Sequence, residues 1–333
     1  MTTTTFSQWS AEKAWEWYDR QPWPCGFNYI PASAINCAEM WMDYGFDPSL
    51  IAAELALGRE IGFNCARVML PFVVWEHEPD LFKRRFDTFL EICRRHGLGV
   101  MPVLFDDCAF GPAEDSVFGR QPEVIPGWFM NGWTPSPGHS FVRDPESWPR
   151  LAKYAREIIG GYRGDSRVWV WDLYNEPTNC GMGDISLPLV EEVFRWAREM
   201  SPSQPLTVGR WNDDAGLNAI IKRLSDISTF HDYTGPEALE NNVREIKRQG
   251  RPAICTEWMA RNASTVAGCL PILRRENIGA IHWGLVNGRT QTHLNWGHRP
   301  GDPDPLFWQH DLFHADHTPF DAAEIRLFKE TIA

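Results

Sequence analysis

The chain of 333 residues lacks the features that mark several large classes of protein. None of its eight cysteines forms a C-x-x-C pair, which argues against a zinc ribbon. The N-terminus, "MTTTTFSQWSAEKAWEW", has no basic segment followed by an apolar one, so we do not expect a secretory signal. No apolar run is long enough to span a bilayer. A cytoplasmic protein is the simplest expectation.

Positive charge is also in short supply. The 32 Lys and Arg residues are outnumbered by 44 Asp and Glu residues, and the formal net charge is −12. Nucleic acids and anionic membranes attract basic surfaces, so neither is an expected partner, and a small neutral substrate is favoured. No pattern in the sequence indicates an oligomeric state.

Aromatic residues, in contrast, are abundant. There are 17 tryptophans, and aromatics make up 13% of the chain. Flat rings can pack in a core or stack against the C–H face of a sugar, and we expect most of them in the core and a few in a ligand site. The cysteines lie in apolar stretches, such as Cys65 in "FNCARVML" and Cys255 in "PAICTEW". They are expected to be small buried hydrophobic residues, as suits a reducing compartment.

Short apolar runs alternate with amphipathic helical stretches along the chain. The helix predicted at 47–62, for example, has Asp47 in a capping position and Pro48 at its first turn. Seven further helices are predicted at 81–97, 150–164, 187–201, 217–225, 236–250, 264–279 and 321–331. Eight strands are predicted at 25–30, 63–70, 98–106, 168–177, 205–210, 227–233, 252–258 and 279–285.

This order of elements predicts the fold class. Strict β-then-α alternation favours a parallel sheet with right-handed crossovers, and eight such units favour a closed (β/α)8 TIM barrel of the α/β class. No G-x-G-x-x-G follows the first strand, which disfavours a dinucleotide-binding sheet. We expect one catalytic domain over residues 1–333, with long loops after the third strand (107–144) and the eighth (286–319).

Polar residues gather at the carboxyl ends of the predicted strands, where such barrels carry their catalytic groups. Packing alone does not explain this concentration at one rim. The candidate site residues are Arg67, Asp106, Asp107, Asn175, Glu176, His231, Tyr233, Glu257 and Trp283.

Two of these candidates, Glu176 and Glu257, follow strands on nearly opposite sides of the barrel and can face each other across its mouth. Hydrolysis of a glycosidic bond needs such a pair, one to protonate the leaving oxygen and one to attack or to activate water. A separation of about 5–5.5 Å predicts retention of configuration, and roughly 6.5–9.5 Å predicts inversion. We expect a raised pKa for the acid and an ionised partner beside Arg67. Asp172 is expected to form a buried structural pair.

The motifs resemble those of the clan A glycoside hydrolases, most closely family 5, the cellulase and mannanase family. "WDLYNEP" is similar to the Asn-Glu-Pro signature of that family's fourth strand. The resemblance implies that Glu176 is the acid/base and that Asn175 binds the 2-hydroxyl of the sugar. "ICTEW" resembles the seventh-strand segment, which implies that Glu257 is the nucleophile of a retaining hydrolase of β-linked glycosides or short oligosaccharides.

The remaining motifs assign supporting roles by the same resemblance. "ARVML" implies that Arg67 supports the nucleophile. "FHDY" resembles a sixth-strand His-x-Tyr segment, which implies that Tyr233 hydrogen-bonds the nucleophile and that His231 lines the site. "HWGL" resembles the eighth-strand platform, which implies that Trp283 stacks under the sugar.

The third strand departs from the family pattern. It ends in "LFDDCAF" instead of a histidine pair, and we expect Asp106 and Asp107 to grip sugar hydroxyls. The aromatic residues of the two long loops either wall off the cleft into a pocket or pack on each other as lids. They are Trp128, Phe129, Trp133, Trp296, Phe307 and Trp308.

Three alternative functions remain. A transglycosidase would use the same two glutamates, and a non-catalytic carbohydrate-binding barrel would not need both. A metal-dependent barrel hydrolase would need His-x-His after the first strand, where the chain reads "GFNYIP". The histidines at 310, 314 and 317 have no compact ligand spacing, so we expect no metal and no cofactor.

Overall fold

The computed structural model describes residues 7–333 and contains a parallel barrel of eight strands. This confirms the predicted fold class. Successive strands are hydrogen-bonded neighbours in the order β5-β4-β3-β2-β1-β8-β7-β6. Their bounds are β1 Cys25–Asn28, β2 Cys65–Met69, β3 Gly99–Asp106, β4 Trp171–Asn175, β5 Leu206–Thr207, β6 Ser228–His231, β7 Ala253–Glu257 and β8 Gly279–Trp283.

The backbone bridge that closes the ring between β5 and β6 lies beyond the short fifth strand. Arg210 forms a parallel bridge with Phe230. Its N–H donates to the Thr229 carbonyl at 2.9 Å, and its carbonyl accepts from the N–H of His231 at 2.8 Å. The chain after β5 is thereby held against the end of β6, at the barrel mouth.

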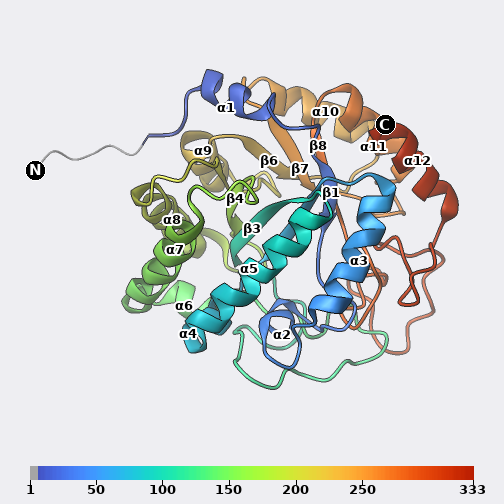
Figure 1. The fold of residues 1–333 in the computed structure, drawn as a ribbon, viewed down its shortest axis with the longest axis horizontal. Helices are drawn as coiled ribbons and strands as arrows, with labels where there is room; N and C mark the ends of the chain where they lie inside the picture. The colour runs from blue at the N-terminus through green and yellow to red at the C-terminus, as the bar shows by residue number, and fades with distance from the viewer. Residues whose placement is uncertain (1–6) are drawn as a thin grey trace, which may run out of the picture.

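Helices surround the barrel in Figure 1, and none within residues 7–333 is long and apolar enough to cross a membrane. Four of them were not predicted: α1, α2, α4 and the short α6, which interrupts the long segment after β3. Their bounds are α1 Ala11–Tyr18, α2 Cys37–Trp41, α3 Pro48–Ile61, α4 Phe72–His77, α5 Pro79–Arg95, α6 His139–Arg143, α7 Trp148–Tyr162, α8 Leu187–Glu199, α9 Ala215–Leu224, α10 Pro236–Lys247, α11 Val266–Arg275 and α12 Ala322–Ile332.

Local chemistry explains where α3 begins and ends. The Asp47 side chain accepts hydrogen bonds from two free N–H groups of the first turn, and Pro48 occupies a position where no N–H is needed. Gly62 ends the helix with φ +107°, a left-handed conformation that glycine adopts without steric cost. Between these ends, Ile51 and Leu55 face the barrel and are fully buried.

Apolar side chains fill the barrel interior at the end opposite its mouth, and α1 covers that end. The interior cluster contains Cys65, Met101, Val170, Ile227, Ile254 and Ile281, with Ala14 and Tyr18 of α1 packed against it. The Tyr18 hydroxyl donates to the Asn277 carbonyl at 3.0 Å. All eight cysteines are free thiols and seven are buried, as expected. With one end of the barrel filled, a ligand can enter only from the other.

His282, which precedes Trp283 in β8, does not belong to the polar rim at the barrel mouth. Side chains alternate along a strand, and where Trp283 faces the mouth, His282 faces the helix layer. It is fully buried among aromatic rings, with centroids 5.2 Å from those of Phe63 and Phe328. Burial, with a smaller effect of the Arg261 charge, lowers the pKa of His282 to about 3.

Acid should therefore destabilise the protein through this histidine. From about pH 6.5 down to about pH 3, the unfolded chain binds a proton at His282 and the folded chain does not, so stability falls as pH falls. His282→Phe should reduce the slope of the unfolding free energy against pH by up to about 1.4 kcal/mol per pH unit in this window. Denaturant titrations between pH 4 and 7 measure that slope. His96→Phe, at a partly exposed histidine, serves as control. Equal slopes for wild type and His282→Phe would contradict the prediction.

Candidate active site

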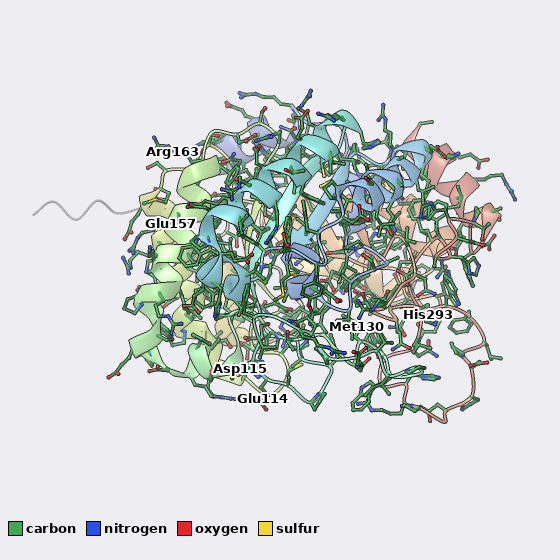
Figure 2. The ribbon with its side chains drawn as sticks, turned by 60° about the horizontal axis from the view of Figure 1, so that its bottom comes forward. Glu114, Asp115, Met130, Glu157, Arg163 and His293 are labelled. Carbon is green, nitrogen blue, oxygen red and sulfur yellow. The ribbon has the colours of Figure 1, made fainter. Side chains whose placement is uncertain are left out.

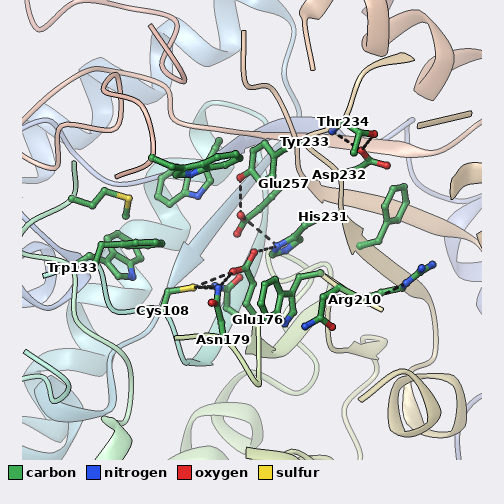
Figure 3. A pocket seen from close by; sticks show the side chains of 18 of the residues that line it. Cys108, Trp133, Glu176, Asn179, Arg210, His231, Asp232, Tyr233, Thr234 and Glu257 are labelled. Carbon is green, nitrogen blue, oxygen red and sulfur yellow. Dashed lines mark hydrogen bonds and ion pairs between the residues drawn. The ribbon is translucent and has the colours of Figure 1, made fainter. Parts of the chain in front are cut away.

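A cavity of about 480 Å³ opens at the carboxyl ends of the strands, and Glu176 and Glu257 face each other within it (Figure 3). One carboxylate oxygen of each glutamate and a ring nitrogen of His231 all lie within 4.8 Å of one another. The carboxylates come from the turn after β4 and from the last residue of β7. The structure thus brings together the two glutamates that the sequence paired.

Three side chains contact the Glu176 carboxylate. His231 Nδ1 lies 2.6 Å from Oε1, while Asn179 Nδ2 and Cys108 Sγ donate to Oε2 at 2.5 Å and 3.2 Å. The backbone of Glu176 has φ +42°, a conformation that is uncommon outside glycine and often occurs at functional sites. Its side chain is therefore held from several directions at one edge of the cavity.

Glu257 has a different set of partners. Arg67 Nη1 donates to Oε1 at 2.8 Å, and the Tyr233 hydroxyl donates to Oε2 at 2.8 Å. His231 Nδ1 also lies 3.5 Å from Oε2. A guanidinium and two further donors favour the ionised carboxylate and oppose the effect of its burial.

Arg67 is fully buried, and four side chains of the barrel accept its hydrogen bonds. Besides Glu257, it contacts Asp172 at 2.8 Å, Asn28 at 2.7 Å and Asn175 at 2.7 Å. Asp172 therefore forms the buried pair that the sequence indicated. Because a guanidinium offers donors in one rigid plane, this set orients Glu257 and Asn175 relative to each other.

The protonation of the pair differs from the expectation. Burial raises the pKa of Glu176, but the hydrogen bond and positive charge of His231 outweigh it, and the net shift is downward. Burial raises the pKa of Glu257, and the charge of Glu176 raises it further; the charges of His231 and Arg67 and the hydrogen bond from Tyr233 lower it, but the net shift is upward. Burial lowers the pKa of His231, yet the two carboxylates raise it overall. These directions favour a proton on His231 over one on the neighbouring Glu176.

Asp106 does not line the cavity, which corrects its expected contact with sugar. It is buried, and its oxygens accept hydrogen bonds from Asn175 Nδ2 at 2.8 Å, Cys108 N at 2.9 Å and Trp133 Nε1 at 2.9 Å. Burial raises the pKa of Asp106 to about 7. Its contacts hold Asn175 and Trp133 in place instead of binding the ligand directly.

Asp107 is likewise buried outside the cavity lining, and the expected sugar contact is not available to it. Its oxygens accept from the Tyr174 hydroxyl at 2.7 Å and from Thr178 N at 2.9 Å. Thr178 has φ +82° and follows Glu176 by two residues. Asp107 therefore stabilises the strained turn that carries Glu176.

Aromatic rings form much of the cavity wall. Trp283 lies at the end of β8, and its ring meets that of Trp133 edge-on with centroids 5.7 Å apart. Phe129 and Trp296 line the cavity too, so both long loops contribute. The other three loop aromatics named from the sequence do not line it: Trp128, Phe307 and Trp308.

Several lining or supporting residues escaped the sequence analysis. Asn28 ends β1 and supports Arg67, and its place at a strand end was the signal that would have found it. Cys108 and Asn179 contact Glu176 from the segments that follow β3 and β4. Trp211 and Asn212 lie after β5, which is too short to mark the rim clearly.

One group within residues 7–333 places three potential metal ligands together, and it consists of Glu176, His231 and Glu257. A cation bound there would face the Arg67 guanidinium 2.8 Å from Glu257. The electrostatics suit a shared proton better than a divalent ion. The histidines at 310, 314 and 317 form no such group in the part of the chain that is described.

An eight-stranded parallel barrel with two facing glutamates, a buried arginine and an aromatic wall at its mouth defines the class of (β/α)8 glycoside hydrolases. Residues 48–296 match the family model described as Cellulase (glycosyl hydrolase family 5). The chain belongs to glycoside hydrolase family 5, and it is a glycoside hydrolase.

Proteins similar to this chain include three that share 15–21% sequence identity with it. It is 21% identical over 298 residues to a β-1,4-xylanase of Dictyoglomus thermophilum, an alignment that covers 73% of this chain and 82% of the xylanase. The endo-β-1,4-mannanase of Thermotoga petrophila has the same fold, with a TM-score of 0.61, 15% identity, and coverage of 95% of this chain and 77% of the mannanase. The exo-β-1,4-mannosidase Op5Man5 of Opitutaceae bacterium strain TAV5 has a TM-score of 0.63 at 19% identity, and 93% of this chain matches 59% of that one.

Proposed function

We propose that the protein hydrolyses β-linked glycosides or short oligosaccharides with retention of configuration, with Glu257 as nucleophile and Glu176 as acid/base. The observation that carries this proposal is the carboxylate separation, since their nearest oxygens lie within 4.8 Å. That bound fits the separation of about 5–5.5 Å between the carboxyl groups of retaining enzymes better than the roughly 6.5–9.5 Å that leaves room for the water of an inverting one.

In the first step the Glu257 carboxylate attacks the anomeric carbon. A C–O bond forms to Glu257 as the bond to the leaving oxygen breaks, and Glu176 gives that oxygen a proton. The proton reaches Glu176 from His231, whose Nδ1 lies 2.6 Å away. Arg67 and Tyr233 hold Glu257 ready for attack, each at 2.8 Å.

In the second step Glu176, now an anion, removes a proton from water, and the oxygen of that water attacks the anomeric carbon. The bond to Glu257 breaks, and its electron pair returns to the carboxylate. Asn175, held by Arg67 and Asp106, is placed to bind the 2-hydroxyl of the sugar. Trp283 offers a ring face for stacking at the cavity wall.

The names of the relatives support the proposed substrate class. The names of the xylanase, mannanase and mannosidase all specify β-1,4 linkages. We extend that linkage to this chain, because an aromatic-lined cavity of about 480 Å³ suits sugar rings. The whole chain is proposed to act as one catalytic domain, since residues of the loops after β3 and β8 share one cavity.

The configuration of the first product tests the mechanism. With an aryl β-glycoside as substrate, the sugar released first should be the β-anomer, because two displacements restore the starting configuration. Proton NMR of the anomeric signals in the first minutes, before mutarotation, measures this. An α-anomer as first product would exclude Glu257 as nucleophile and would indicate direct attack by water.

A further inference from the structure

The loops after β3 and β8 meet above the ends of β1 and β2. In the strand order, β2 and β1 stand between β3 and β8, so any contact between these two loops must cross that part of the mouth. Figure 2 shows Met130 of the first loop and His293 of the second on the same side of the molecule. These two loops therefore bound the cavity on the side of β1 and β2.

Gln291 fastens the two loops together. Its Nε2 donates to the carbonyls of Ile125 at 2.9 Å and Trp128 at 3.0 Å, and its Oε1 accepts from Gly127 N at 3.0 Å. The side chain is almost fully buried. A buried amide that satisfies three backbone groups is costly to disrupt, because each would otherwise lose its partner.

Further contacts extend this closure to the loop after β1. His298 Nδ1 lies 2.7 Å from the Gly127 carbonyl, and the Thr290 hydroxyl donates to the Ala34 carbonyl at 3.0 Å. The backbone at Gly288 runs so close to Ala32 that a Cβ at residue 288 would lie 2.2 Å from its carbonyl oxygen. Three loops thus form one packed wall over β1 and β2.

Almost no space remains behind this wall. Beyond Trp133 and Trp283, over the ends of β1 and β2, lies a void of about 10 Å³. That is at most the size of one water and far below that of a sugar ring. The large cavity extends past the glutamate pair, where Figure 3 shows Arg210 and Asp232 on the side opposite Trp133.

The acid/base decides which part of the substrate lies on which side. A general acid stands beside the oxygen that leaves, so the leaving group lies next to Glu176. Glu176 follows β4, and the neighbouring segment after β5 carries Trp211, whose Nε1 donates to the Pro177 carbonyl at 2.8 Å. Asn212 and Asn242 continue the lining on that side. The leaving group thus occupies the part of the cavity beyond Glu176, which residues after β5 line. The sugar whose anomeric carbon is attacked faces the wall of loops.

We propose that the protein is an exo-acting glycosidase that removes one sugar at a time from the non-reducing end of a β-linked oligosaccharide. This rests on the proposed retaining function and adds to it the place of the cut. The wall held by Gln291 leaves room for a single sugar on the non-reducing side of the scissile bond. The polar part of the cavity after β5 receives the rest of the oligosaccharide.

Oligosaccharides labelled at the reducing end provide the test. The sugar is the one whose aryl β-glycoside the enzyme hydrolyses with retention. Two substrates are compared: the β-1,4-linked tetrasaccharide of that sugar, and the same tetrasaccharide blocked by a 4,6-acetal at its non-reducing end. The earliest labelled product should be the trisaccharide, with free monosaccharide, and the blocked compound should resist. Labelled mono- or disaccharide as the first product would overturn the exo assignment.

The aryl glycoside separates the two proposals. If it is hydrolysed with retention while the tetrasaccharide is cut internally, the inference fails and the proposed function stands. If retention itself fails, the proposed function is wrong, whatever the cut position.

Gln291→Ala tests the wall itself. Loosening the wall should raise the share of cuts at internal bonds about tenfold. A tenfold change corresponds to a loss of ~1.4 kcal/mol in the preference for the terminal bond over internal bonds. Gln204→Ala is a matched control, because Gln204 is equally buried and its Nε2 binds the carbonyls of Tyr162 and Asp165, before β5 and away from the mouth. Gln204→Ala should keep the wild-type products. Unchanged products in folded Gln291→Ala would overturn the role of the wall.

Discussion

Glu257→Ala is expected to lower kcat by at least about 10⁴-fold on every β-glycoside, because no other group can form the covalent intermediate. The fold should survive. Arg67 keeps its contacts to Asp172, Asn28 and Asn175 when the glutamate is removed, so its charge stays paired. Steady-state kinetics and thermal unfolding measured on the same preparation check both halves of the prediction.

Azide gives the Glu257 experiment a sharper outcome. In Glu257→Ala the vacated space beside the anomeric carbon admits a small anion, which attacks from the side of the lost carboxylate and yields an α-glycosyl azide. A matched control is Glu54→Gln, a buried glutamate on α3 that contacts Tyr29 and Ala32 outside the cavity. It should keep kcat within about threefold and change only stability. Substantial turnover by Glu257→Ala without azide would exclude its role as nucleophile.

Glu176→Ala is expected to separate substrates by their leaving groups. Oligosaccharides need a proton on the departing oxygen, and their hydrolysis should slow by about 10²–10⁴-fold, the usual contribution of general acid catalysis. A dinitrophenyl glycoside needs no such proton, so its first step should continue at nearly the wild-type rate. The second step should then become limiting, since no base activates water. A rapid burst of dinitrophenol followed by slow turnover is the expected trace.

Azide also tests the acid/base role of Glu176. With Glu176 absent, azide replaces water on the intermediate without needing a base, and the product should be the β-glycosyl azide, opposite to that of Glu257→Ala. If both substrate types slow equally, or if the azide product is α, the acid/base role of Glu176 is wrong. The neighbouring Asn179→Ala, which removes one hydrogen bond to the same carboxylate, should separate the two substrate types far less than Glu176→Ala does.

Much of the fold was predictable because its signals are local. Hydrophobic periodicity recurs along the units, a capping residue such as Asp47 marks the start of some helices, and eight units in sequence leave few alternatives to a closed barrel. The two glutamates were also predictable, since strand ends in such a barrel point to one mouth. Helix α1 was missed, because its role is to cover the barrel end formed by strands more than forty residues away in sequence, such as β2.

The supporting residues were harder to assign. Asp106 and Asp107 were expected to touch sugar, but their partners are Asn175, Trp133 and the turn at Thr178, which come from distant segments. The order of carboxyl pKa values was predicted wrongly for a similar reason. It depends on His231 lying within 2.6 Å of Glu176, a distance that the sequence does not contain.

The sequence by itself determined the barrel, its eight units and the pair of glutamates, since periodicity and strand-end position follow from neighbouring residues. Only the tertiary structure decided which carboxylates contact Asn175, that His282 packs against helices, and that Gln291 closes one side of the mouth. The reason is physical: side-chain direction at a strand end, and contact between loops, depend on packing between segments that lie far apart along the chain.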